Sequence, residues 1–279
     1  MADVLLFLYL PFLAGLILTG IHAYLGVHVV ERGVIFVDLS LAQIAALGTT
    51  IAVLRGIDPH APQTYWWSLG FTIIGAAVFA TTRVHRETRI PQEAIIGIVY
   101  AVSAAAAILA MSKATGETEH LKDMLVGNIL SVNGSTVAKT AVLYALVGLF
   151  HFIFRKKFLA ISVGAHSGTA ESIPNLKLWD FLFYTSFGFV VTSSVAIAGV
   201  LLVFSYLIVP SVAAMLFSKN IGTRLAIGWS MGALVSGIGV LLSFKLDLPT
   251  GATIVCTFGI ALALMAVVWA FTKRKEIVA

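Results

Sequence analysis

The chain has 279 residues, of which 59% are hydrophobic and only 11% carry a charge. A soluble domain with so few charges would expose large apolar patches, so this composition excludes a water-soluble globular protein and indicates a polytopic membrane protein. The net charge of +5 therefore concerns membrane topology and contact with anionic lipid, and we expect no binding to nucleic acid.

Sequence motifs narrow the chemistry further. The single cysteine, Cys256, excludes an intrachain disulfide and any metal site built from several cysteines. The sequence contains no G-x-x-x-x-G-K-[ST] and no H-E-x-x-H, the signatures of P-loop ATPases and of many metalloproteases. We therefore expect the chain itself not to be an enzyme and to hold no cofactor.

Nine hydrophobic segments follow one another along the chain. They cover residues 4–30, 33–54, 66–82, 93–112, 135–154, 178–198, 199–217, 222–243 and 249–271. No Lys or Arg precedes the first segment, which is also longer than a signal-peptide core, so we expect a membrane helix there and no cleaved signal. Residues 178–217 form either two crossings or one crossing with a broken or re-entrant segment. The prediction is an all-α membrane protein with eight or nine transmembrane helices in one domain, residues 1–279.

Basic residues fall in every second loop between these segments. Residues 82–92 hold three arginines, residues 155–157 read RKK, Lys219 and Arg224 follow the seventh segment, and residues 273–275 read KRK. The loops between them are neutral or acidic. Because basic loops stay on the cytoplasmic side, this alternation predicts an N-terminus outside the cell and a C-terminus in the cytoplasm.

Two loops have features of their own. Residues 117–130, on the outward side, would place four apolar side chains on one face of a helix: Leu121, Met124, Leu125 and Leu130. Such a helix would be either an interfacial amphipathic helix or a gate or docking surface for an external partner. The inward loop 160–175 contains Gly164, Gly168 and Pro174, so we expect it to be irregular.

Polar side chains within or beside the spans are candidate site residues, because burying an ionisable group in lipid is costly. Five stand out: His22, His28, Asp38, Gln43 and Glu93. The first two segments form a hairpin turning near residue 33, which would put His28 level with Asp38, about 7.5 Å from the turn. His22 would lie level with Gln43, about 15 Å into the membrane. These residues indicate either a cation path or interfacial and interhelical hydrogen bonds.

The stretch 195–217 combines a long apolar run with Pro210, and a basic element at 218–224 follows it. This pattern indicates a proline-broken membrane helix that leads into a short cytoplasmic element.

Six motifs along the chain occur in an order typical of one family. They are LGVHVV at 25–30 followed by Arg32, the segment 40–48, EAIIGI at 93–98, LVGNIL at 125–130, GVLLVFSYLIVPSVAA at 199–214 and DLPTG at 247–251. Together they cover nearly the whole chain. The sequence thus resembles the membrane-spanning subunit of the ABC-3 family of ATP-binding-cassette importers, the permeases of zinc, manganese and iron uptake systems.

The resemblance implies a fold and partners. It implies a type II-like importer permease in the bacterial inner membrane that pairs as a dimer, most simply a homodimer. Two cytoplasmic ATPase subunits would hydrolyse ATP and an extracytoplasmic protein would deliver the substrate, a divalent metal or small metal complex, to a path that opens by alternating access. The ATPase-coupling region would lie within 210–224, including Pro210, Ser211, Ala214, Lys219 and Arg224. Ser211 and Val212 stand where the family favours alanine.

The second segment departs from the family pattern. Metal permeases of this family carry G-D-x-x-x-H there, and the i, i+4 spacing puts a carboxylate and an imidazole on one helix face, as a divalent metal requires. This chain has Leu39 and Gln43 at those two positions and Asp38 in place of the glycine. Either His22 and His28 replace the missing ligands, or the substrate is not a bare metal ion. Glu93 matches the family's acidic position.

Three other functions stay open. One is an ABC-3-like permease for a non-metal solute. Another is an ion-coupled secondary transporter, which would need carboxylates at the middle of the membrane, whereas Asp38 and Glu93 lie near segment ends. The third is an intramembrane enzyme.

Overall fold

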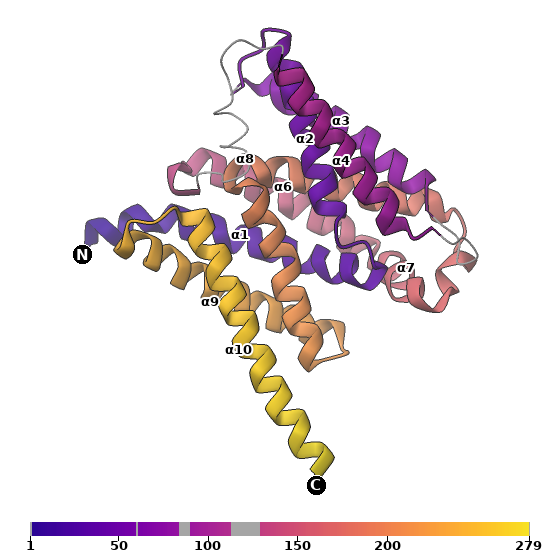
Figure 1. Cartoon of the computed structure of the whole chain (residues 1–279), viewed down its shortest axis with the longest axis vertical. Helices are drawn as coiled ribbons and strands as arrows, with labels where there is room; N and C mark the ends of the chain where they lie inside the picture. The colour runs from indigo at the N-terminus through magenta and orange to yellow at the C-terminus, as the bar shows by residue number, and fades with distance from the viewer. Residues whose placement is uncertain (1, 60, 84–89, 113–128, 279) are drawn as a thin grey trace. The chain divides into compact units, whose positions relative to one another are not determined.

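The computed structural model describes residues 2–59, 61–83, 90–112 and 129–278, and these residues form helices with no strand (Figure 1). The α-helices are α1 Ala2–Arg32, α2 Val37–Leu54, α3 Pro62–Thr81, α4 Gln92–Met111, α6 Gly134–Ile153, α7 Arg155–Ser167, α8 Leu176–Phe217, α9 Ile221–Leu246 and α10 Thr250–Val278. Two 3-10 helices, η1 Ile129–Ser131 and η2 Thr169–Ser172, complete the set. The prediction of an all-α chain is confirmed.

Seven of the described helices are long and apolar enough to cross a membrane: α1, α2, α4, α6, α8, α9 and α10. Each of the nine predicted segments coincides with a helix or with part of one. The helix α3 matches the predicted segment 66–82 but is not among these seven. The chain is therefore a multi-pass membrane protein, as the composition predicts.

The helix α8 explains why the segment 178–217 is ambiguous in the sequence. It runs for 42 residues, about 63 Å at 1.5 Å per residue, which is twice the thickness of a hydrocarbon core. At Gly199 the backbone leaves the helical region, with φ of 75° and ψ of 161°. That conformation is essentially restricted to glycine. The break falls where the two predicted segments meet and leaves a length suited to one crossing on each side.

Contacts divide the chain into two compact units. Unit 1 comprises residues 1–30, 126–142 and 197–279, and unit 2 comprises residues 31–125 and 143–196. Both units are discontinuous in sequence, so each depends on packing between helices that are far apart along the chain. The expectation of one transmembrane domain remains a prediction.

In unit 1, small residues let α1 lie against the second part of α8. A β-carbon added at Gly26 would lie only 2.0 Å from the carbonyl oxygen of Leu207. Beside this contact the Ser211 hydroxyl donates to the Leu207 carbonyl at 2.8 Å and reaches the Ala23 carbonyl at 3.3 Å. Close approach at glycine and hydroxyl groups bonded across helices are typical of packing within membranes.

In unit 2, α2 packs against both α3 and α4 (Figure 1). Gly48 allows the approach to α3, because a β-carbon there would lie 2.8 Å from the α-carbon of Ser68. The Ser68 hydroxyl donates to the Ala45 carbonyl at 2.8 Å, and Thr72 bonds Thr192 of α8 at 3.2 Å. Hydroxyl groups therefore hold α2, α3 and α8 together in the interior of this unit.

The expectation of an irregular loop at 160–175 is wrong. Residues of this stretch form most of α7 and all of η2, and only Gly168, with φ of 78°, makes the turn between them. Gly164 lies inside α7, at the point where η2 packs closely against that helix. A β-carbon at residue 164 would lie 2.8 Å from the Ala170 nitrogen. Most of the predicted outward surface helix, residues 117–128, lies outside the described residues.

Candidate functional site

The two candidate histidines lie on α1 and belong to unit 1. His22 is fully buried, and its Nδ1 lies 2.8 Å from the Leu18 carbonyl, one turn earlier in the same helix. His28 is also buried, and its ring stacks edge-on against Tyr24 with centroids 4.7 Å apart. Six residues separate the two along the helix, so they lie about 9 Å apart in height and on different faces. The structure therefore does not bring the two imidazoles together on one helix face, and a shared ion remains a prediction.

Asp38 stands in the first turn of α2, in unit 2, and is 1% exposed. Neither oxygen of its carboxylate has a hydrogen-bond partner among the residues that the structure describes. Phe36, the N-cap residue of α2, provides no side-chain cap, so the positive end of the helix dipole acts on Asp38 directly. A buried carboxylate without a partner is costly, and a bound cation would compensate for that cost.

Glu93 lies at the same end of unit 2 as Asp38. It occupies the first turn of α4, and its Oε1 accepts a hydrogen bond of 2.9 Å from the backbone N–H of Phe36. Its other oxygen, Oε2, is buried and has no partner within the described part of the chain. Two carboxylates with three unpaired oxygens therefore stand near the start of α2.

Gln43 is half-buried on α2, five residues after Asp38, which places the two about 140° apart around the helix. The described residues contain no group of three or more His, Cys, Asp or Glu side chains close enough to hold a metal ion. Asp38, Gln43 and Glu93 belong to unit 2 and the two histidines to unit 1. A site that joins all five therefore remains a prediction.

Sequence reasoning did not identify Tyr144 of α6, which is buried in unit 2. The buried Tyr144 hydroxyl bonds the Ser194 hydroxyl, accepts from Ser193 at 3.2 Å and lies 3.4 Å from the Val190 carbonyl. A tyrosine within an apolar helix gives no sequence signal of such a partner, because the contact depends on how α6 and α8 pack.

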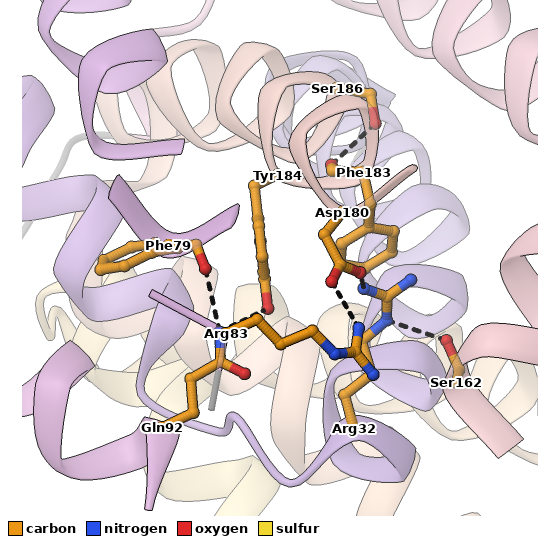
Figure 2. A network of polar contacts seen from close by, with 9 residues as sticks. All are labelled: Arg32, Phe79, Arg83, Gln92, Ser162, Asp180, Phe183, Tyr184 and Ser186. Atoms are coloured by element: carbon orange, nitrogen blue, oxygen red, sulfur yellow. Dashed lines mark hydrogen bonds and ion pairs between the residues drawn. The ribbon is translucent and has the colours of Figure 1, made fainter. Parts of the chain in front are cut away.

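A second polar centre in unit 2, also missed, surrounds Asp180 in the first turns of α8. Figure 2 shows the Asp180 carboxylate between two guanidinium groups. Arg32 Nη1 donates to Oδ1 at 2.7 Å, and Arg83 donates to Oδ2. Arg32 also donates to the Ser162 hydroxyl of α7 at 2.9 Å and lies 3.8 Å above the Phe183 ring. This network connects the end of α1, the helix α7 and the helix α8. Arg83, which follows the end of α3, is its fourth member.

Beside this network, Gln92 connects the start of α4 to α3 and α8. Its side-chain nitrogen donates to the Phe79 carbonyl at 3.1 Å and to the Tyr184 hydroxyl at 3.4 Å (Figure 2). The sequence signal that could have identified Asp180 is the one that identified Asp38, a carboxylate at the start of an apolar segment.

The proposed coupling residues differ in their surroundings. Pro210, Ser211 and Ala214 lie inside α8 and are buried in unit 1. Arg224, in the first turn of α9, is 8% exposed, and its Nε donates to the Ser218 carbonyl at 2.7 Å. Only Lys219, in the short link between the two helices, is exposed. No separate helix lies between α8 and α9. Of the five proposed coupling residues, Lys219 is therefore the one whose side chain is available to a partner.

Comparison with known proteins identifies the family to which the chain belongs. The model of the ABC 3 transport family matches residues 5–270. The manganese transport system membrane protein MntC of Listeria innocua is 27% identical over 261 residues, covering 89% of this chain and 91% of that protein. A probable iron transport system membrane protein of Haemophilus influenzae is 27% identical over 244 residues, covering 87% and 86%.

A solved structure has the same fold. PsaBC from Streptococcus pneumoniae, in complex with Fab, superposes with a TM-score of 0.76 at 20% sequence identity. The match covers 95% of this chain and 93% of that one.

Proposed function

Because the chain belongs to the ABC 3 transport family, we propose that it is the membrane-spanning permease subunit of an ATP-binding-cassette importer for a divalent transition metal. The names of the manganese and iron transport relatives support this class of substrate. The multi-pass helical architecture supports the role of a permease.

One observation within the chain carries the proposal. Asp38 is buried in a membrane protein with both carboxylate oxygens unpaired among the described residues. Carboxylate oxygens suit manganese and other hard divalent ions. Intramembrane carboxylates that lack a protein partner are typical of ion pathways. Asp38 would bind the ion in transit, with Glu93 as the second carboxylate at the same end of α2.

Transport would follow alternating access driven by separate ATPase subunits. The helix α7 fits a contact with such a subunit, because its 13 residues, about 20 Å, are too few to cross a membrane. Phe158, Ile161 and Ser162 anchor it in unit 2, whereas Arg155, Lys156 and Lys157 remain exposed. We infer that α7 of unit 2 meets the ATPase, and that Lys219 of unit 1 is a separate point of contact with it.

A second form of the substrate is also supported. The described residues supply no three-ligand cluster, so a metal that arrives as a small complex, with its own ligands, would need fewer ligands from the permease. The two carboxylates would then either occupy the coordination positions that the metal's own ligands leave open or bind a cationic complex as a whole.

The experiment is metal accumulation in cells that express the complete importer, with and without this chain. The proposal predicts ATP-dependent accumulation of manganese or iron that disappears when the chain is deleted and returns when it is restored. Each metal is supplied once as the free ion and once as a soluble chelate, which separates the two forms of the substrate. Accumulation of every metal that is independent of the chain would contradict the proposal.

A further inference from the structure

A cavity of about 590 Å³ lies in unit 2 where α8 begins. It is lined by Arg83, Glu171, Asn175, Leu176, Lys177 and Leu178, and is called here the Lys177 cavity. Its volume lies in the range of cavities that hold small ligands. Its lining combines charged side chains with leucines, so it differs in chemistry from both the Asp38 site and the apolar faces of the spans.

Among the described residues at the cavity, positive charges outnumber negative ones. Arg83, in its lining, shares the carboxylate of Asp180 with Arg32, so two guanidinium groups face one carboxylate. Lys177 adds a third positive charge and Glu171 a second negative one, which leaves 3 − 2 = +1 for the set. Arg32 and Asp180 form a buried, neutral pair, so the excess lies with Arg83 and with the exposed Lys177 at the surface of the unit.

One hydrogen-bond donor of the two guanidinium groups at Asp180 is also without a partner. Arg32 Nη2 is buried and has no hydrogen-bond partner among the described residues. Arg155, Lys156 and Lys157 at the start of α7 extend the excess of positive charge on the surface of the same unit. The electrostatic field at this end of unit 2 therefore favours an anionic ligand.

The apolar part of the lining belongs to a membrane boundary. Leu176 and Leu178 open α8, the long apolar helix, and Leu178 is 53% exposed. Trp179 follows, and its ring lies 5.3 Å from the Phe154 ring and 5.8 Å from the Phe158 ring, between centroids. Aromatic side chains at the end of a membrane helix are typical of the interface between lipid headgroups and acyl chains.

We propose that the Lys177 cavity binds an anionic phospholipid. Lys177 and Arg83 hold the phosphate, and Leu176 and Leu178 pack against the first methylene groups of an acyl chain. A soluble anion would use only the basic part of this lining, and an acidic protein segment would not need exposed leucines at the membrane boundary. Basic pockets beside membrane helices are known to recognise anionic lipid headgroups on the cytoplasmic side. The proposal does not depend on which metal the chain transports.

The test is lipid retention by the purified importer, measured by native mass spectrometry after titration with phosphatidylglycerol or phosphatidylcholine. Wild type should retain phosphatidylglycerol in preference to phosphatidylcholine. Lys177→Gln should weaken phosphatidylglycerol binding about fivefold, the loss typical of one basic residue at a lipid surface, and Lys177→Arg should restore it. Lys245→Gln is the matched control, because Lys245 is an exposed lysine in the last turn of α9.

Four outcomes would overturn the proposal. One is equal retention of the two lipids by wild type, and another is the same affinity for phosphatidylglycerol in Lys177→Gln and Lys245→Gln. The third is displacement of the lipid by inorganic phosphate at an equal concentration, which would indicate a site for a soluble anion. Loss of the ATPase subunit from Lys177→Gln with unchanged lipid binding would also count against it, because the cavity would then be a protein-docking surface.

Discussion

The Oε1 atom of Glu93 accepts a hydrogen bond from the backbone N–H of Phe36 across 2.9 Å, which ties the first turn of α4 to the N-cap of α2. Asp38 lies two residues after Phe36, so the same contact fixes the start of the helix that carries the unpaired carboxylate. Glu93 therefore has two separable properties, a hydrogen bond that positions α2 and a negative charge beside the proposed path.

Substitutions at Glu93 should separate these two properties. Glu93→Gln keeps a carbonyl acceptor for the Phe36 N–H but removes the charge, so we expect the wild-type melting temperature and reduced metal uptake. Glu93→Ala removes both, and the loss of a helix-capping contact should cost about 1 kcal/mol of stability as well. Thermal unfolding in detergent and metal uptake by the reconstituted importer measure the two effects. Normal uptake by Glu93→Gln would leave Glu93 with a positioning role only.

The Asp180 network predicts unequal effects of removing its members. Asp180→Asn leaves two guanidinium groups, one of them buried, without a counter-charge, and should destabilise the chain by about 3–5 kcal/mol. Arg83→Gln should cost less, because Arg32 and Asp180 still form a neutral pair and the Arg83 side chain is 14% exposed. Melting temperatures of the purified variants provide the comparison. Equal losses in the two variants would contradict the arrangement in Figure 2.

Two glycines of α1 provide a matched pair for the packing of unit 1. Gly26→Ala places a methyl group 2.0 Å from the Leu207 carbonyl, so the two helices must separate and we expect a loss of at least 1–3 kcal/mol, the usual cost of overpacking. Gly20→Ala meets no atom within 4 Å and should leave the melting temperature unchanged or slightly raised. Similar melting temperatures for the two variants would show that α1 does not cross α8 at Gly26.

The link between α8 and α9 distinguishes coupling from stability. Arg224→Glu reverses the charge of a buried guanidinium that holds the Ser218 carbonyl, so the melting temperature should fall. Lys219→Glu changes an exposed side chain, so the melting temperature should stay the same while ATP hydrolysis per transported ion rises. The two readouts are unfolding in detergent and the ratio of ATP hydrolysis to uptake in proteoliposomes. An unchanged ratio in Lys219→Glu would remove this link from the ATPase contact.

The sequence predicts the elements of this fold better than their contacts. Apolar runs identify the helices, because membrane insertion depends on local composition. The sequence predicts a break at Pro210, but Pro210 lies inside α8 and the backbone leaves the helical region at Gly199 instead. The glycines at 164 and 168 suggest a loop, but tertiary packing overrides that signal: Gly164 is where η2 packs against α7. The composition of a segment does not encode which distant partner a charged residue meets.

The candidate site shows the same limit. Asp38 and Glu93 can be identified as unusual from the sequence, since each is a carboxylate at the start of an apolar segment. The contact of Glu93 with the Phe36 backbone depends on how α2 and α4 pack, which no local pattern specifies. Asp180 has the same local signature as Asp38, yet its partners are two arginines that neutralise it. Only the fold distinguishes the paired carboxylate from the unpaired one.

The most direct test of the account is metal uptake by importer reconstituted in proteoliposomes, comparing Asp38→Asn with Asp247→Asn. Asp247 is an exposed carboxylate whose backbone, with φ of 52°, lies in the left-handed region that asparagine also tolerates, so it controls for the loss of one charge. The account predicts that Asp38→Asn remains folded and assembled but loses most of its ATP-dependent manganese or iron uptake, whereas Asp247→Asn transports normally. Equal uptake by Asp38→Asn and wild type, for both metals and their chelates, would contradict the assignment of Asp38 to the substrate path.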